Sequence, residues 1–249
     1  MIILNEKEAA MKIIDNDCLG DSTSEDLVLL AKYYKKEGIH AKDIKNKLNM
    51  FITKSIPSVN ISKWDKTVDY AINCAKKYPL LELNSIAITE SEINIIKGID
   101  GVTAQRLMFT LLCLAKVGNA KSDRNSGWVN RDEGEIFRLA NIQRSPREKE
   151  MIINMLWKAG YIGYSNLVDN ININVKIVDD SSVPVMYVHD FRNLGYQYTN
   201  HINGGFFECS MCGIMVKKIS NNQKYCKSCS EKIIQQKKHE SYIKRYYKN

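Results

Sequence analysis

Apolar positions in the first eighty residues recur every three or four places, which is the period of helices that bury one face. Glycines and polar clusters interrupt this pattern. The helices are therefore predicted at about residues 1–20, 22–38, 41–51 and 62–77. The pattern at residues 80–88 fits either a helix or a strand. The N-terminal part of the chain is expected to form a helical bundle.

Two helix starts carry a capping box, in which Ser or Thr is followed three positions later by Glu. The pattern occurs at Ser22 and at Thr89, and its side chains can satisfy amide groups that a first helical turn leaves free. The second box opens a short helix that ends near Lys97. Residues 103–117 are then apolar on almost every side, so we predict a buried helix at the centre of the N-terminal half.

Residues 118–127 are polar and rich in turn formers, and the apolar pattern changes after them. One helix is predicted within residues 128–142. A second begins at Pro146 and ends near residue 159, with Ser145 and Glu148 as its capping box. Alternating apolar residues then predict strands, which we place at residues 161–165, 171–177 and 183–188, with a turn at 168–170.

The apolar face of the helix after Pro146 is assigned to four residues, Met151, Ile152, Met155 and Leu156. A further helix is expected at residues 191–201. Asp190 is assigned as its N-cap, because an aspartate carboxylate can accept the free amide protons of a first turn. The pair Gly204-Gly205 then forms a hinge before the C-terminal segment.

The C-terminal segment holds two CxxC pairs, Cys209/Cys212 and Cys226/Cys229, with thirteen residues between them. Each short loop lets two thiolates face one ion, and the spacer is long enough to bring the second pair round to complete a tetrahedron. Four protein ligands leave no open coordination position, so the spacing predicts a structural zinc ion. Iron is the alternative, because it also accepts four thiolates.

The sequence shows no sign of export or of a membrane span. Its first residues lack a basic region before an apolar stretch, and no apolar run approaches the roughly 20 residues that a membrane helix needs. We therefore expect a cytoplasmic protein. Thiols stay reduced in the cytoplasm, which favours zinc over disulfide bonds for the clustered cysteines.

The formal net charge of +8 is concentrated in the C-terminal segment. Residues 209–249 carry ten Lys or Arg and two acidic residues, whereas the first 208 residues carry 26 of each sign. This asymmetry predicts an anionic partner, with nucleic acid as the first candidate and a merely solvated basic helix as the alternative. Tyrosines in the tail can stack on bases, and the candidate phosphate contacts there are Lys237, Lys238, Lys244 and Arg245.

Residues 127–179 present a helix, a turn, a capped helix, a glycine and a β-hairpin in that order, and this stretch resembles a winged helix. The run Leu156-Trp-Lys-Ala-Gly-Tyr-Ile is similar to the end of many second helices in that family. The resemblance implies a helix that enters the major groove of DNA and a wing near the phosphates. The implied base-side residues are Arg144, Ser145, Arg147 and Lys149, and the implied wing residues are Asn170, Asn172 and Lys176.

The module departs from the family pattern in one respect, because Glu148 and Glu150 lie among these basic residues. DNA-binding winged helices usually show a clearer positive surface. Winged helices also serve as protein-binding modules, and that interpretation stays open here.

The cysteine segment resembles a zinc ribbon, with Cys209, Cys212, Cys226 and Cys229 as the implied ligands. Some metal nucleases embed their site in a comparable scaffold, but they need a histidine base. The spacer between the two cysteine pairs contains no histidine. We therefore expect no enzymatic activity.

Together the patterns predict a mainly α fold with small β elements. The predicted domains are an N-terminal helical domain at 1–118, a winged-helix-like domain with an extra strand and helix at 127–202, and a zinc ribbon with a basic helical tail at 206–249. This arrangement and the Lys/Asn/Ile-rich composition resemble proteins encoded by phages and mobile elements of low-GC Gram-positive bacteria.

The sequence leaves two candidate functions. The first is a non-enzymatic accessory protein that binds nucleic acid, DNA rather than RNA, in transcription, replication or counter-defence. The second is a protein adaptor or inhibitor that docks on a host nucleic-acid machine or defence complex. Neither function places the protein at a membrane.

Overall fold

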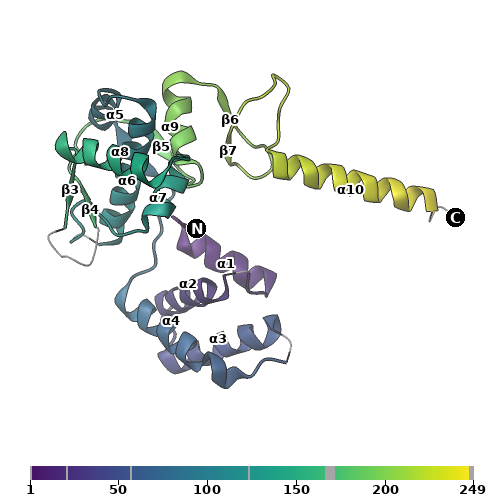
Figure 1. Ribbon diagram of the computed structural model, residues 1–249. Coiled ribbons are helices and arrows are strands. Elements are labelled where there is room, and N and C mark those ends of the chain that lie inside the picture. The colour runs from purple at the N-terminus through teal and green to yellow at the C-terminus, as the bar shows by residue number, and fades with distance from the viewer. Residues whose placement is uncertain (1, 21, 57, 123, 166–171, 247–249) are drawn as a thin grey trace. The chain divides into compact units, whose positions relative to one another are not determined.

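The computed structural model describes residues 2–20, 22–56, 58–122, 124–165 and 172–246 (Figure 1). The described part is mainly helical with small sheets, as the sequence predicts. The predicted turn at 168–170 and its Asn170 lie outside the described residues. Among the helices of the described part, none has the length and apolar character that a bilayer span requires.

The chain divides into two compact units. Unit 1 comprises Met1–Ile86 with Asn119–Asn125, and unit 2 comprises Ala87–Gly118 with Ser126–Asn249. This division differs from the predicted one, which ended the first domain at residue 118. The apolar pattern shows that a helix is buried, but it does not show which neighbours bury it.

Unit 1 is a helical bundle in which each helix turns its apolar face inward. Its helices are α1 (Glu6–Asn16), α2 (Thr23–Lys36), α3 (Ala41–Ser55), the short 3-10 helix η1 (Ile61–Trp64) and α4 (Asp65–Lys77). Leu30, Leu48 and Val68 are buried in the centre of one continuous core. The four helices predicted in this region are confirmed, with shifted ends.

One capping prediction in unit 1 is wrong. Ser22 is the N-cap of α2, but its side chain makes no capping hydrogen bond, so the box with Glu25 does not form. The carboxylate of Asp26 instead accepts a hydrogen bond from the backbone N–H of Gly20 at 2.7 Å. A side chain one position further along therefore binds the chain just before the helix.

Unit 2 contains α5 (Glu90–Lys97) and most of α6 (Val102–Lys121), together with the strand β1 (Ile86–Thr89) that leads into α5. The predicted capping box at Thr89 is present, and the backbone N–H of Thr89 donates to the Glu92 carboxylate at 2.8 Å. The prediction that residues 103–117 form a buried helix is confirmed.

A buried ion pair holds α6 in unit 2. The ammonium of Lys116 lies 2.9 Å from the Glu92 carboxylate on α5 and 2.7 Å from that of Asp180. The side chains of Lys116 and Glu92 are 5% and 0% exposed, and charges so deeply buried are stable only when they are paired. The aromatic rings of Phe109 and Tyr198 pack at 5.3 Å further along the helix. These contacts are long-range, so the local pattern could not reveal them.

A three-stranded antiparallel sheet follows in unit 2. It consists of β2 (Trp128–Val129), β3 (Ile162–Tyr164) and β4 (Ile173–Val175) in the spatial order β2-β4-β3. Asn174 at its centre faces Trp128 on one side and Gly163 on the other. Two helices lie between β2 and β3 in the chain, α7 (Glu133–Leu139) and α8 (Pro146–Lys158).

The rest of unit 2 begins with β5 (Pro184–Val188), which pairs with β1. It continues with α9 (Leu194–Asn203), the antiparallel strands β6 (Phe206–Glu208) and β7 (Met215–Lys217), and α10 (Lys227–Tyr246). The predicted start of the ninth helix is wrong: its N-cap is Asn193 and not Asp190. Asp190 binds the guanidinium of Arg192 instead, at 2.8 Å from Nε.

Candidate metal centre and nucleic-acid interface

The four cysteines of the C-terminal segment converge as the sequence predicts. Their sulfur atoms all lie within 4.8 Å of one another, and the sulfurs of Cys212 and Cys226 are 3.8 Å apart. Cys209 follows β6, and the turn after Cys212 closes at Gly213, which has a positive φ of 72° that favours glycine. Cys226 precedes α10 and Cys229 lies in its first turn.

This sulfur cluster fits a tetrahedral metal ion. Zinc binds thiolate sulfur at about 2.3 Å, so two ligands of a regular tetrahedron lie about 3.8 Å apart. The separation of Cys212 and Cys226 agrees with that value, and the cluster is buried apart from the partly exposed Cys212. The four cysteines can therefore hold a metal ion, and the set is compatible with zinc. Four thiolates would also suit iron.

The surroundings treat the four thiols unequally. Burial on its own raises the pKa of a thiol, but backbone N–H groups, including that of Cys226 at 3.3 Å, lower the pKa of Cys209 to about 6. Burial raises the pKa of Cys229 to about 12, and hydrogen bonds with the neighbouring cysteines add to the rise. These surroundings favour the thiolate at Cys209 and the thiol at Cys229, and binding of a cation would favour the thiolate at both.

The segment that carries the four cysteines is bound to the start of α9. A guanidinium nitrogen of Arg192 donates to the backbone carbonyl of Cys212 at 2.5 Å, and the side-chain amide of Asn193 donates to the carbonyl of Met215 at 2.9 Å. The rings of Tyr196 and Phe206 pack at 4.8 Å. Arg192 and Asn193 were not predicted as anchors, because the backbone carbonyls that they bind lie about twenty residues further along the chain.

The second candidate site is the outer face of α8. Four exposed residues, Arg147, Met151, Asn154 and Lys158, follow one another at spacings of four, three and four, so they form one stripe along the helix. The predicted burial of Met151 is wrong, since 63% of that side chain is exposed. Ile153 and Leu156 are the buried residues of this helix. The run from Met151 to Trp157 is apolar at almost every position, so composition alone could not fix which side faces the core.

The residues predicted to contact bases at the start of α8 differ in their exposure. Ser145 caps the helix and forms the predicted box with Glu148. Arg144, Ser145 and Arg147 are exposed, although Arg144 lies 3.3 Å from the Glu148 carboxylate and is partly neutralised by it. Lys149 is only half-exposed, and its ammonium lies over the Phe137 ring at 5.0 Å from the centroid.

The remaining predicted contacts lie on other elements. Lys176, just after β4, is exposed, and its side chain lies close to Gly163 of β3. Asn172 is partly buried. On α10 all four predicted cations are exposed, namely Lys237, Lys238, Lys244 and Arg245. Lys237, Lys238 and Arg245 line a shallow groove along that helix together with Ile234 and Tyr242.

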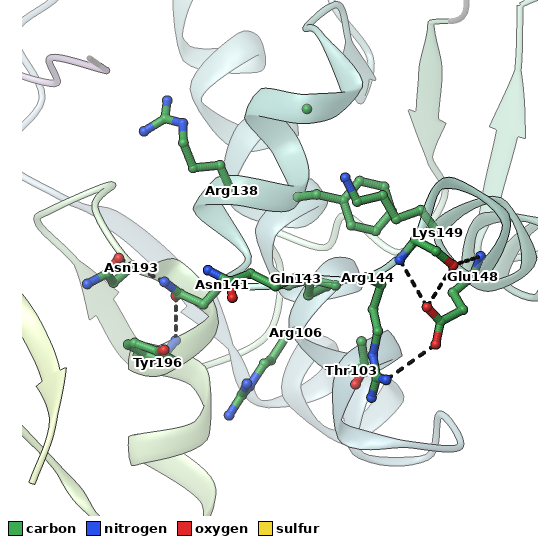
Figure 2. A pocket seen from close by; sticks show the side chains of 14 residues that line it. Thr103, Arg106, Arg138, Asn141, Gln143, Arg144, Glu148, Lys149, Asn193 and Tyr196 are labelled. Atoms are coloured by element: carbon green, nitrogen blue, oxygen red, sulfur yellow. Dashed lines mark hydrogen bonds and ion pairs between the residues drawn. The ribbon is translucent and has the colours of Figure 1, made fainter. Parts of the chain in front are cut away.

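A cavity of about 980 Å³ opens beside the start of α8 (Figure 2). Its lining combines side chains from the beginning of α6, from α7, from the turn between α7 and α8, and from the start of α9. Arg106, Arg138, Arg144 and Lys149 contribute positive charge, and Glu148 is its acidic member. Arg106 and Arg138 were not predicted from the sequence, because they lie on two different helices and no motif links them.

Close packing fixes the wall of this cavity. Gly195 of α9 lies so near α7 that an added Cβ would stand 1.9 Å from the carbonyl oxygen of Ala140, so only glycine fits there. The side-chain amide of Asn141 donates to Asn193 at 2.8 Å, and the backbone N–H of Tyr196 donates to Asn141 at 3.2 Å. The turn before α8 is thereby held against α9.

The cysteine segment and the cavity share one anchor residue, Asn193. Asn193 bonds to the α7–α8 turn on one side and to the cysteine segment on the other. What this molecule does has to be inferred from these sites, because comparison of the chain with protein-family models, with curated proteins and with solved structures gave no match.

Proposed function

We propose that α6, β2, α7, α8, β3 and β4 form a winged-helix domain that binds DNA without catalysing a reaction on it. The support comes from the order of these elements and from the sheet order β2-β4-β3, in which the strand before the two helices pairs with the last strand of the hairpin. α8 takes the place of the helix that enters the major groove.

The exposed stripe on α8 carries the proposal. It offers a guanidinium at Arg147, a carboxamide at Asn154 and an ammonium at Lys158, all on one side of one helix. Arginine and lysine donate to guanine and asparagine pairs with adenine, so these groups match base edges in the major groove. Met151 adds an apolar contact of the kind that a thymine methyl group accepts.

The metal centre has a supporting role in this proposal. A zinc ion bound by Cys209, Cys212, Cys226 and Cys229 would be structural, because the four sulfurs complete its coordination. It would fix the start of α10, whose exposed cations Lys237, Lys238, Lys244 and Arg245 then add contacts to phosphates.

The test is the affinity for duplex DNA across a salt series, measured by fluorescence anisotropy. The variant R147Q/K158Q is expected to bind duplex more weakly than the wild type. Its matched control is K63Q/K66Q, which removes the same charge from two exposed lysines of unit 1 and is expected to bind like the wild type. The variant N154A is expected to lose about 1–3 kcal/mol of discrimination at one base pair. Failure of the wild type to bind duplex at low salt, or preference for single-stranded RNA, would contradict the proposal.

One observation favours the adaptor function as a second candidate. Trp157 and Tyr164 are 48% and 38% exposed, and their rings pack against each other at 6.0 Å. Aromatic residues exposed as a pair are typical of protein-binding surfaces. In this alternative the variant W157A/Y164A loses a protein partner of the domain but keeps its affinity for DNA.

A further inference from the structure

We propose that the cavity beside α8 is a track for the sugar–phosphate backbone of DNA, with Arg106 and Arg138 contacting two separate phosphates. This inference rests on the proposed DNA binding and adds to it. It assigns phosphate contacts to two helices, α6 and α7, that lie outside the stripe on α8.

The charge of the cavity supports an anionic ligand. Among the residues that the structure describes, neither Arg106 nor Arg138 forms an ion pair with a carboxylate. Arg106 is held in place by a hydrogen bond from its Nε to the Thr199 hydroxyl at 2.8 Å and by stacking on Tyr196 at 5.5 Å. The hydrogen bond to Thr199 uses Nε, so the two terminal nitrogens of the guanidinium can donate to a ligand. A guanidinium is well suited to bind phosphate oxygens.

One helix start reinforces this charge. Thr103 lies in the first turn of α6 and lines the cavity. The first turn of a helix carries amide protons without intrahelical partners and a partial positive charge, so the start of α6 favours a phosphate group. The start of α8 adds less, because its capping box with Glu148 is formed and Pro146 has no N–H to donate.

The placement of the two arginines favours a long anion over a small one. Figure 2 shows Arg138 and Arg106 on opposite sides of the α7–α8 turn, with Asn141 and Gln143 between them. Because the turn lies between the two arginines in this view, we infer a ligand that carries more than one phosphate. A nucleic-acid strand carries a phosphate at every nucleotide, so it can satisfy both at once.

The experiment measures how the affinity for a fluorescent DNA duplex depends on salt for R106Q, R138Q and the double variant. Each phosphate contact contributes about 0.9 to the slope of log K against log salt. Each single variant is therefore expected to flatten the slope by about 0.9 and the double variant by about 1.8. The charge-matched control K63Q/K66Q is expected to leave the slope unchanged, and R106K, which keeps the charge, is expected to retain it.

The fold of each variant is checked by circular dichroism. Arg106 has packing partners, so R106Q can disturb unit 2. Arg138 is exposed and has no carboxylate partner among the described residues, so R138Q then carries the test alone. A normal slope in a folded R138Q would overturn the inference and leave the proposed function standing.

Three further outcomes would also overturn it. Flattening of the double variant by only about 0.9 would mean that both arginines serve one phosphate. Tight binding of adenosine monophosphate that R106Q abolishes would assign the cavity to a free phosphorylated ligand. A wild-type protein that binds no duplex at all would remove the inference together with the proposed function.

Discussion

The molecule presents positive charge in two ways, on α10 and around α8. The cations of α10 follow each other closely in sequence, and from Glu231 to Arg245 every side chain is exposed except the half-buried Ile233. Those around α8 come from several helices and lie among acidic residues. Three of them are held in place, Arg106 by a hydrogen bond, Arg144 by an ion pair and Lys149 by a ring contact. The first set dominates the net charge of the chain, whereas the second contributes little to that total.

We infer from this difference that one set of cations attracts nucleic acid and that the other recognises a particular site on it. Exposed charges on a solvated helix attract any polyanion, and their effect falls steeply with salt. Cations fixed relative to one another can select a particular arrangement of phosphates and base edges. We therefore expect α10 to dominate how fast and how salt-dependently the protein binds, and the stripe on α8 to govern which site it binds.

The largest effect is expected from breaking the cluster of four cysteines, because it lies at the start of α10. Cys226→Ser removes one of four sulfurs and should abolish stoichiometric metal binding. Apparent metal-binding free energies in small zinc modules are about 10–16 kcal/mol, so the segment from β6 to β7 is expected to lose its structure. The measurement is metal content by atomic emission, together with hydrogen exchange of residues 206–229.

Cys18→Ser is the matched control for this variant, because Cys18 is exposed and lies outside the cluster. It should retain full metal content. Hydrogen exchange in α8 should change little in Cys226→Ser, since α8 is capped by its own residues Ser145 and Glu148. Loss of structure in α8 as well would show that the two regions are not independent.

Local signals in the sequence were sufficient for the metal centre and for the start of α8. The four cysteines and the capping box of Ser145 and Glu148 act over a few neighbouring residues, and both are present in the structure. The same kind of signal failed at Ser22, where Asp26 binds the preceding backbone instead. Competition between nearby polar side chains decides such cases, and spacing alone does not resolve it.

Sequence could not supply the contacts made between distant segments. The placement of α6 in unit 2 depends on a buried ion pair of Lys116 with Glu92. The cavity depends on Gly195 and Asn193 binding the end of α7 and the turn that follows it. Arg106 and Arg138 are ordinary helix residues by spacing, and only tertiary packing places them on one cavity.

The second-largest effect is expected from reversing the positive charge of α10. Reversal of four charges in K237E/K238E/K244E/R245E is expected to flatten the salt slope of DNA binding by up to about 3.6, since each lost phosphate contact accounts for about 0.9. Affinity should fall by a similar factor for every DNA sequence tested. The measurement is anisotropy on a panel of duplexes at several salt concentrations.

The contrasting variant for this test is N154A, which leaves the charge unchanged. It is expected to alter the ranking of duplexes in the panel and to keep the wild-type slope. The division of roles fails if charge reversal on α10 changes the ranking, or if it leaves the slope as it was.

The smallest effect is expected from removing the cap of α8. This variant tests whether the cap holds the exposed stripe of that helix in position. Ser145→Ala removes the hydroxyl that accepts a hydrogen bond from the backbone N–H of Glu148, and loss of such a cap costs about 1 kcal/mol. The first turn of α8, with Arg147, should then exchange its amide protons about fivefold faster, the factor that corresponds to this free energy. The control is Ser228→Ala, in the first turn of α10. Among the described residues the side chain of Ser228 makes no capping bond, so its loss should not change the exchange of α8.

The interaction between Ser145 and Glu148 also makes the amide exchange of the first turn of α8 depend on pH. The backbone N–H and the hydroxyl of Ser145 donate to the Glu148 carboxylate and lower its pKa, and Arg144 adds to the effect. A carboxyl group whose pKa is lower in the folded state stabilises the fold above its ordinary pKa and loses that contribution as the pH falls through the folded value. Protection of the first turn in the wild type should therefore decrease on acidification, and Ser145→Ala should decrease less because one donor is already missing. Equal acid sensitivity in the two proteins would show that the backbone N–H and Arg144 alone hold the carboxylate.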